Sequence, residues 1–201
     1  MIIVPLTLAY KGQRNYLQGG DLYNGIIDAI DGHVDGKKGP FRLAVHNFAS
    51  RQCDMLINES GEQLTKPEGL VAEFTIGSAR GMVTGWLMET ERDVVNRNPY
   101  DESVIQALCT DEGESIEMRG ETPYTPIEVA ISMTKQLHYR LYPIVDGKWI
   151  FTKLELGRLL EDNDSARLKV TARHNLNNRL TKSIITAGGE QVGSIYFSVK
   201  S

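Results

Sequence analysis

The polar side chains that begin at residue 21 are the first in this sequence that could take part in catalysis. Asp21 follows Gly19 and Gly20, where the absence of side chains would let a ligand approach the backbone closely. A carboxylate at that place could orient a water molecule for attack on a carbonyl carbon. Asn24 and Asp28 follow at helical spacing and would continue a polar stripe. We predict Asp21 and Asp28 as candidate catalytic residues and Asn24 as a candidate substrate-binding residue.

The same residues have a structural interpretation that the sequence leaves open. An apolar stripe through Tyr23 and Ile26 predicts a helix over residues 21–30, and Asp21 is placed to cap its N-terminus. If the helix were enclosed by sheet, a buried Asp28 would need a partner. Burial would also raise its pKa, and a raised pKa would let it act as a base. On an exposed face the stripe would be solvated.

Two aromatic or imidazole side chains are candidates for substrate contact. His46 shares one face of a predicted strand with Arg42 and Phe48, and the sequence supplies no acid beside it. Trp149 precedes a second helix predicted over residues 152–161 and could wall an apolar tunnel there. The alternatives are a surface histidine and an ordinary core tryptophan.

A basic set in the second half is the strongest electrostatic feature of the sequence. Arg167, Lys169 and Arg173 occupy alternating positions of a predicted strand, with Leu168 and Val170 between them facing the core. Their charges could hold the phosphates of a CoA-like ligand, a nucleic-acid backbone or an acidic segment. The alternative is a solvated face of a sheet.

Composition excludes several classes of protein. The 201 residues include 22 Lys+Arg against 26 Asp+Glu and are 41% hydrophobic, which is typical of a globular protein with a real core. No apolar run is long enough to span a membrane, and no spacing of ligands or glycines indicates a metal or cofactor site. Two cysteines cannot form a disulfide framework and favour a reducing compartment. We expect a cytoplasmic protein without membrane, metal or cofactor, and we leave a homo-oligomer open.

Charge divides the chain into three parts. Residues 1–96 carry a net charge of −3, residues 97–126 carry −5 and residues 127–201 carry +4. The middle part holds three of the seven prolines. It predicts an acidic connector with one short helix over residues 100–109.

The two outer parts share an order of predicted elements: a strand or hairpin, then a helix, then several strands. In the second half the first strands are expected from Val129 and Tyr139, with a turn at Asp146. Short identities accompany this order, namely residues 42–45 beside 167–170 and residues 61–63 beside 189–191. Such matches also arise by chance, and a tandem duplication is therefore a hypothesis.

The late segment Ala-Gly-Gly-Glu-Gln-Val-Gly-Ser-Ile-Tyr-Phe, residues 187–197, resembles the late hairpin of the hot-dog fold. With the order of elements, the chain resembles a tandem double hot dog: an α+β protein with two halves, each an antiparallel sheet around one central helix. The resemblance implies an acyl-thioester hydrolase or an acyl-binding protein. It implies acyl-CoA or an acyl carrier protein as partner.

The sequence also departs from that family. Dehydratase members carry a histidine in the segment before the helix, and residues 15–21 and 148–152 hold none. A non-catalytic binding or assembly homologue is therefore an alternative. A tandem ferredoxin-like RNA-binding protein is a third, less favoured because the chain is acidic overall.

Overall fold

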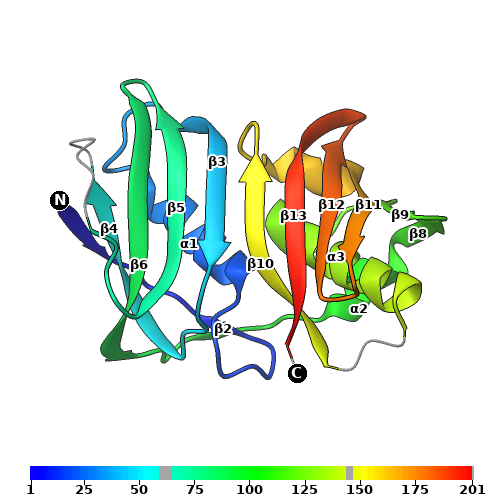
Figure 1. The fold of residues 1–201 in the computed structure, drawn as a ribbon, viewed down its shortest axis with the longest axis horizontal. Coiled ribbons are helices and arrows are strands. Elements are labelled where there is room, and N and C mark those ends of the chain that lie inside the picture. Colours follow the sequence, from blue (N-terminus) through cyan, green and yellow to red (C-terminus); the bar gives the residue numbers. More distant parts are fainter. Residues whose placement is uncertain (59–64, 144–146, 201) are drawn as a thin grey trace. The chain divides into compact units, whose positions relative to one another are not determined.

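The computed structural model describes residues 1–58, 65–143 and 147–200. It divides the chain into two units, Met1–Tyr100 and Asp101–Ser201. Each unit has an antiparallel sheet and one long helix (Figure 1). Gly61 to Gln63, half of one identity used to suggest a duplication, and the turn expected at Asp146 lie outside the described residues.

The sheet of the first unit has five strands in the order β1-β4-β6-β5-β3. They are β1 (Ile2–Pro5), β3 (Lys38–Val45), β4 (Arg51–Asn58), β5 (Leu70–Ser78) and β6 (Gly81–Asp93). Two further strands, β2 (Tyr10–Lys11) and β7 (Arg97–Asn98), form a separate parallel pair. The second strand of that pair begins the segment that was expected to be a connector.

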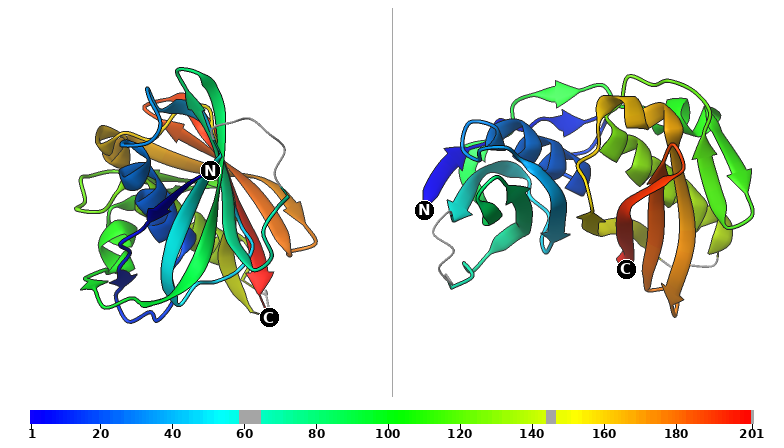
Figure 2. Two further views of the ribbon diagram at one scale, coloured as in Figure 1. Left: turned by 90° about the vertical axis from the view of Figure 1, so that its left-hand side faces the viewer. Right: turned by 90° about the horizontal axis from the view of Figure 1, so that it is seen from above.

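The helix of the first unit, α1 (Gly19–Ile30), confirms the helix predicted over residues 21–30. Leu22, Ile26 and Ile30 are fully buried, as the apolar periodicity requires. In the view from above, α1 lies on the inner side of the curved strands of its own unit (Figure 2, right). The helix begins two residues earlier than predicted, and its N-cap is Gln18, not Asp21.

The second unit has a six-stranded sheet in the order β10-β13-β12-β11-β9-β8. The strands are β8 (Cys109–Glu112), β9 (Ser115–Met118), β10 (Lys148–Leu156), β11 (Leu168–Leu176), β12 (Leu180–Ala187) and β13 (Glu190–Lys200). Its helices are α2 (Glu102–Ala107), α3 (Pro126–Leu141) and the 3-10 helix η1 (Asp162–Arg167). The short helix predicted over residues 100–109 is α2.

The long helix of this unit is α3, and the prediction of a helix over residues 152–161 is wrong. Residues 148–156 form β10, in which Trp149, Phe151, Leu154 and Leu156 are buried. A register shift between Phe151 and Lys153 interrupts the alternation of buried and exposed residues along the strand. The sequence of this segment therefore does not show the two-residue period of a regular strand. Val129 and Tyr139, expected to start strands, lie in α3.

The two sheets differ in the order of their last two strands. In the first unit, β6 lies between β4 and β5. In the second unit, β11, β12 and β13 follow one another in space as in sequence. The hairpin expected at residues 187–197 is confirmed: Gly188 and Gly189 form the turn between β12 and β13 with φ of +59° and +88°, which suits glycine in a two-residue hairpin.

The core of the first unit depends on one position without a side chain. Gly85 of β6 lies opposite Phe74 of β5, and a Cβ atom at Gly85 would lie 2.3 Å from Phe74 Cζ and 2.9 Å from the carbonyl oxygen of Leu56. Phe74 stacks on Phe41, which in turn contacts Tyr23 of α1. The ring over Gly85 therefore links the sheet to the helix.

We predict that Gly85→Ala destabilises the protein by about 1–3 kcal/mol, because the ring or a backbone carbonyl must shift. Gly32→Ala is the matched control, since its Cβ would meet no atom within 4 Å. Urea unfolding of both variants measures the difference. Equal midpoints for the two variants would contradict the packing described.

Candidate functional site

The first turn of α1 is built by a reciprocal pair of hydrogen bonds. The backbone N–H of Gln18 donates to Asp21 Oδ2 at 2.7 Å, and the Gln18 side chain accepts from the backbone N–H of Asp21. This arrangement is a capping box, in which the N-cap and the third helical residue satisfy each other. Asp21 is only 6% exposed, so its carboxylate is fixed in a buried place.

The second oxygen of this carboxylate has a cationic partner. Lys11 Nζ lies 3.2 Å from Asp21 Oδ1, and the Lys11 side chain is 13% exposed. Burial lowers the pKa of Lys11, and the attraction of Asp21 opposes this only in part, so the pKa stays below its ordinary value. The site therefore contains a largely buried ion pair at the start of a helix.

The backbone of the same turn offers two hydrogen-bond donors. Leu22 N–H donates to the Gln18 carbonyl and Asp21 N–H to the Gln18 side chain, whereas the N–H groups of Gly19 and Gly20 have no acceptor within the described part of the chain. Both glycines are buried and have no side chain to obstruct an approaching atom. Two adjacent donors at the positive end of a helix suit a carbonyl oxygen that gains negative charge.

The other two candidates on α1 lie outside this cluster. Asp28 is exposed, so the burial on which its role as a base depended is absent. It follows Asp21 by seven residues and so lies on nearly the same side of α1, but only the start of the helix is buried there. Asn24 is half-buried on the same helix. Of the three polar residues predicted along this stripe, the structure buries only Asp21.

His46 lies just after β3, where the fold supplies the acid that the sequence did not show. Its Nε2 atom lies 3.2 Å from Glu73 Oε1 and 3.3 Å from Lys66 Nζ, and Lys66 Nζ lies 3.0 Å from Glu73 Oε2. Burial alone would raise the pKa of Glu73, but Lys66 and His46 outweigh it and hold that pKa below its usual value. The polar groups of His46, Lys66 and Glu73 are therefore engaged with one another at the surface.

Trp149 does not lie beside a helix start, as predicted, but in the core of the second unit. Its ring packs against His138 of α3 with a centroid distance of 4.8 Å, and it is 3% exposed. His138 is fully buried, and its Nε2 atom lies 3.4 Å from Ser183 Oγ. Burial lowers the pKa of His138 to about 4. His138 is therefore a neutral core residue of the second unit.

The basic set predicted to bind phosphate is largely neutralised by the protein itself. Lys169 Nζ lies 2.8 Å from Glu112 Oε2, and this contact raises the pKa of Lys169. Arg167 bonds to Asp164 and to the carbonyl of Asn163. Arg173 alone is exposed without a partner among the described residues, at a register shift of β11. Alternation along β11 is confirmed, but the strand does not present a continuous phosphate-binding face.

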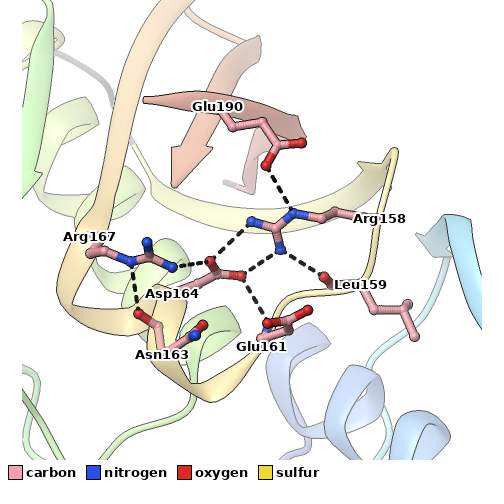
Figure 3. Close-up of polar contacts among 7 residues, drawn as sticks. All are labelled: Arg158, Leu159, Glu161, Asn163, Asp164, Arg167 and Glu190. Atoms are coloured by element: carbon pink, nitrogen blue, oxygen red, sulfur yellow. Dashed lines mark hydrogen bonds and ion pairs between the residues drawn. The ribbon is translucent and has the colours of Figure 1, made fainter. Parts of the chain in front are cut away.

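Asp164 is the centre of the densest charge network that the structure describes (Figure 3). The Arg158 guanidinium donates to both carboxylate oxygens at 2.6 and 3.0 Å, and Glu161 N–H donates to Oδ2 at 2.9 Å. Burial alone would raise the pKa of Asp164, but these hydrogen bonds outweigh it and hold the pKa below its usual value. The network closes η1 onto the end of β10 and serves structure.

Sequence analysis missed Glu128, which occupies in α3 the place that Asp21 occupies in α1. Glu128 Oε2 accepts from Thr125 N–H at 2.7 Å and from Thr125 Oγ1 at 2.8 Å, and the residue is 7% exposed. The signal was present as Thr125-Pro126-x-Glu128, a capping box with proline at the first helical position. Pro126 has no N–H, so this turn leaves only the Ile127 N–H without an acceptor among the described residues.

No group of three His, Cys, Asp or Glu side chains is arranged to hold a metal ion within the described ranges. No helix there has both the length and the apolar character needed to cross a membrane. At the start of α1, in contrast, a buried carboxylate, a cation and two backbone donors come together. We take it as the candidate site.

Comparison with known proteins gives the fold. No protein-family model and no curated protein sequence matches the chain. The TesB protein of Mycobacterium avium subspecies paratuberculosis is similar in structure at 14% identity and a TM-score of 0.51, over 96% of this chain and 91% of that chain. A protein of Novosphingobium aromaticivorans described as a thioesterase is 12% identical over 100% and 94% of the two chains, with a TM-score of 0.48. The chain is an α+β protein with a hot-dog fold, which confirms the resemblance of the sequence to that fold.

The network around Asp164 yields a prediction for stability. We expect Arg158→Met to cost about 3 kcal/mol, because it leaves a carboxylate that is 1% exposed without its main cation. The double variant Arg158→Met with Asp164→Asn should cost less, since the buried charge is gone. Arg80→Met is the control, because Arg80 is 87% exposed in its pair with Asp35. Chemical unfolding at pH 7 measures these three variants and the wild type, and a double variant less stable than Arg158→Met would contradict the network.

The buried histidine predicts a dependence of stability on pH. Folded His138 has a pKa of about 4 and unfolded histidine about 6.5, so the unfolded chain takes up more protons between these values. The contribution of neutral His138 to the free energy of unfolding is fully present above pH 6.5. The free energy of unfolding falls by up to about 3 kcal/mol as the pH approaches 4. His138→Phe should flatten this part of the profile, and His174→Gln, an exposed control, should leave it in place. Unfolding free energies at several pH values measure the effect.

Proposed function

We propose that the chain is an acyl-thioester hydrolase of the hot-dog type and that the start of α1 is its active site. One observation carries the proposal: the N–H groups of Gly19 and Gly20 are without acceptors in the described structure beside the buried carboxylate of Asp21. The hot-dog fold adds support, because this fold includes enzymes of acyl thioesters. Acyl-CoA and an acyl carrier protein are the expected substrates or partners, and a reducing cytoplasm suits the two free cysteines.

The proposed reaction uses the three groups in fixed roles. The thioester carbonyl oxygen accepts hydrogen bonds from the Gly19 and Gly20 N–H groups, which stabilise the negative charge of the tetrahedral intermediate. Asp21 orients a water molecule and takes its proton as the oxygen bonds to the carbonyl carbon. The carbon–sulfur bond then breaks, the proton passes to the leaving thiolate, and a carboxylic acid and a thiol are released.

We also propose that the two units are two hot-dog halves in tandem. Each has a capping box with a buried acid at the start of its long helix and an antiparallel sheet beside that helix. The start of α3 lacks one backbone donor because of Pro126, so we assign the chemistry to the first unit and a structural role to Glu128.

A binding protein without catalysis is the second candidate. The ion pair between Lys11 and Asp21 favours it, because a carboxylate whose oxygens are already engaged by an ammonium group and a backbone N–H is less available to a water molecule. The segment before α1 also has no histidine. Such a protein would hold the acyl thioester at the same two glycines without turning it over.

The test is the hydrolysis of short- and long-chain acyl-CoAs, measured as the release of free thiol. We expect Asp21→Asn to lower kcat by about 100-fold or more, because the isosteric amide keeps an acceptor for Gln18 but cannot take a proton. Asp31→Asn is the matched control at the other end of α1, where Asp31 is 64% exposed and pairs with Lys37. Circular dichroism checks that both variants fold.

Three outcomes separate the candidates. Activity lost in Asp21→Asn and kept in Asp31→Asn supports the hydrolase. No turnover by the wild type, with calorimetric binding of a non-hydrolysable acyl-CoA thioether, supports the binding protein. Full activity in folded Asp21→Asn overturns the assignment of the site.

A further inference from the structure

Lys11 reaches the candidate site from a segment that belongs to neither α1 nor the main sheet. It is the second residue of β2, a strand of two residues, and its Nζ atom lies 3.2 Å from Asp21 Oδ1. A short isolated strand does not hold a long side chain in place by itself. The surroundings of β2 therefore decide whether this contact is incidental or maintained.

Backbone pairing fixes β2 to a segment more than eighty residues later. Residues 10–15 and 96–100 together form what we call the strap. Within it, β2 pairs in parallel with β7, Tyr10 N–H donates to the Asn96 carbonyl at 3.0 Å, and Gly12 N–H donates to the Asn98 carbonyl at 3.0 Å. Lys11 lies between these two bonds, so its backbone cannot move without breaking one of them.

Arg97 locks the strap from the other side. Its guanidinium donates to the carbonyl oxygens of Gly12 and Arg14 at 2.7 Å each and to Asn15 Oδ1 at 2.8 Å. The same guanidinium lies 5.2 Å from the centre of the Tyr10 ring. Its planar fork of donors serves three acceptors at once in a fixed geometry, whereas a lysine would offer a single rotating ammonium group. Several independent hydrogen bonds thus hold the turn that carries Lys11.

The position of Lys11 has an electrostatic consequence for Asp21. A carboxylate with a side chain that is 5% exposed has lost most of its hydration, and hydrogen bonds and a neighbouring charge compensate for that loss. Gln18 N–H supplies the hydrogen bond on Oδ2, and Lys11 supplies the charge on Oδ1. Each oxygen is held by a different element, which fixes the plane of the carboxylate.

We propose that Lys11 is a positioning residue for Asp21, and that the strap exists to hold it there. The inference rests on the proposed hydrolase function: Lys11 orients the carboxylate that orients the water, and it does not itself react. The site is then assembled from three separate parts of the first unit, namely the strap, the Gln18 turn and the Gly19-Gly20 backbone.

The contact is tested first without any assay of activity. Nuclear magnetic resonance of the Lys11 side chain gives its titration midpoint in the wild type and in Asp21→Asn. Because Asp21 raises the pKa of Lys11 against the effect of burial, the midpoint should fall further when Asp21 loses its charge. Asp31→Asn, which removes the partner of Lys37, should leave it unchanged. Equal midpoints in the wild type and Asp21→Asn would show that the contact is absent and overturn the proposal.

Kinetics then test the positioning role. We expect Lys11→Met to lower kcat by about 100-fold with KM changed by no more than about twofold, because a misplaced group costs turnover and not binding. Lys11→Arg should recover most of kcat. The control is Lys37→Met, which removes a lysine paired with an acid at the opposite end of the same helix. Arg97→Lys, which keeps the charge but loses the fork, should reduce kcat to an intermediate value.

The results divide cleanly between the two proposals. Wild-type kcat in folded Lys11→Met, or a failure of Lys11→Arg to recover it, would remove the positioning role and leave the hydrolase intact. A wild type that hydrolyses no acyl-CoA would remove the hydrolase and with it the catalytic purpose of Lys11, while the titration still decides whether the ion pair exists.

Discussion

A helix that begins inside a protein must satisfy the N–H groups of its first turn without help from water, and α1 and α3 meet this constraint in the same way. In each, an acidic residue at the third helical position and the residue at the N-cap bond to each other. Asp21 and Glu128 are 6% and 7% exposed, so both carboxylates are placed by the helix start and not by solvent. The capping box therefore decides where each helix begins and how its sheet can enclose it.

What remains after the capping box differs between the two units. Gly19-Gly20 leaves two donors and no side chains, whereas Pro126-Ile127 leaves one donor and an apolar side chain. The first unit thus keeps polar groups available at its helix start, and the second uses its polar groups internally, in the Arg158–Asp164 network and the His138 contacts. The same capping arrangement thus stands beside backbone donors without an acceptor among the described residues in the candidate site of the first unit, and beside internally paired polar groups in the second.

The sequence predicted those parts of the fold that local periodicity controls. The stripe of α1, the alternation of β11 and the glycine turn before β13 all follow from spacing alone. The second long helix is not evident from the sequence, because its capping signal at Thr125 lies at the end of the acidic, proline-rich residues 97–126 that predict a connector. Residues 152–161 looked helical because a bulge in β10 and the leucines after it imitate a helical spacing.

The candidate site was only half predictable for a related reason. Asp21, Gly19 and Gly20 are neighbours in sequence, and their combination could be seen there. Lys11, Glu73 as partner of His46 and Glu112 as partner of Lys169 come from other strands, and no local pattern specifies such pairings. Asp28 shares nearly one helix face with the buried Asp21 and is nevertheless exposed, because burial also depends on what covers each turn of α1, which only the tertiary structure decides.

The position of the last strand in each sheet bears on how the protein is made. β6 and β13 are the final strands of their main sheets, yet each lies between two partners, β6 between β4 and β5 and β13 between β12 and β10. During synthesis neither sheet can close until its final strand has left the ribosome, so earlier strands wait with unpaired edges. The strap can form only after this sheet is made, because β7 follows β6 in the chain and pairs with β2, which carries Lys11. The same event that completes the first sheet thus delivers the segment that secures the candidate site.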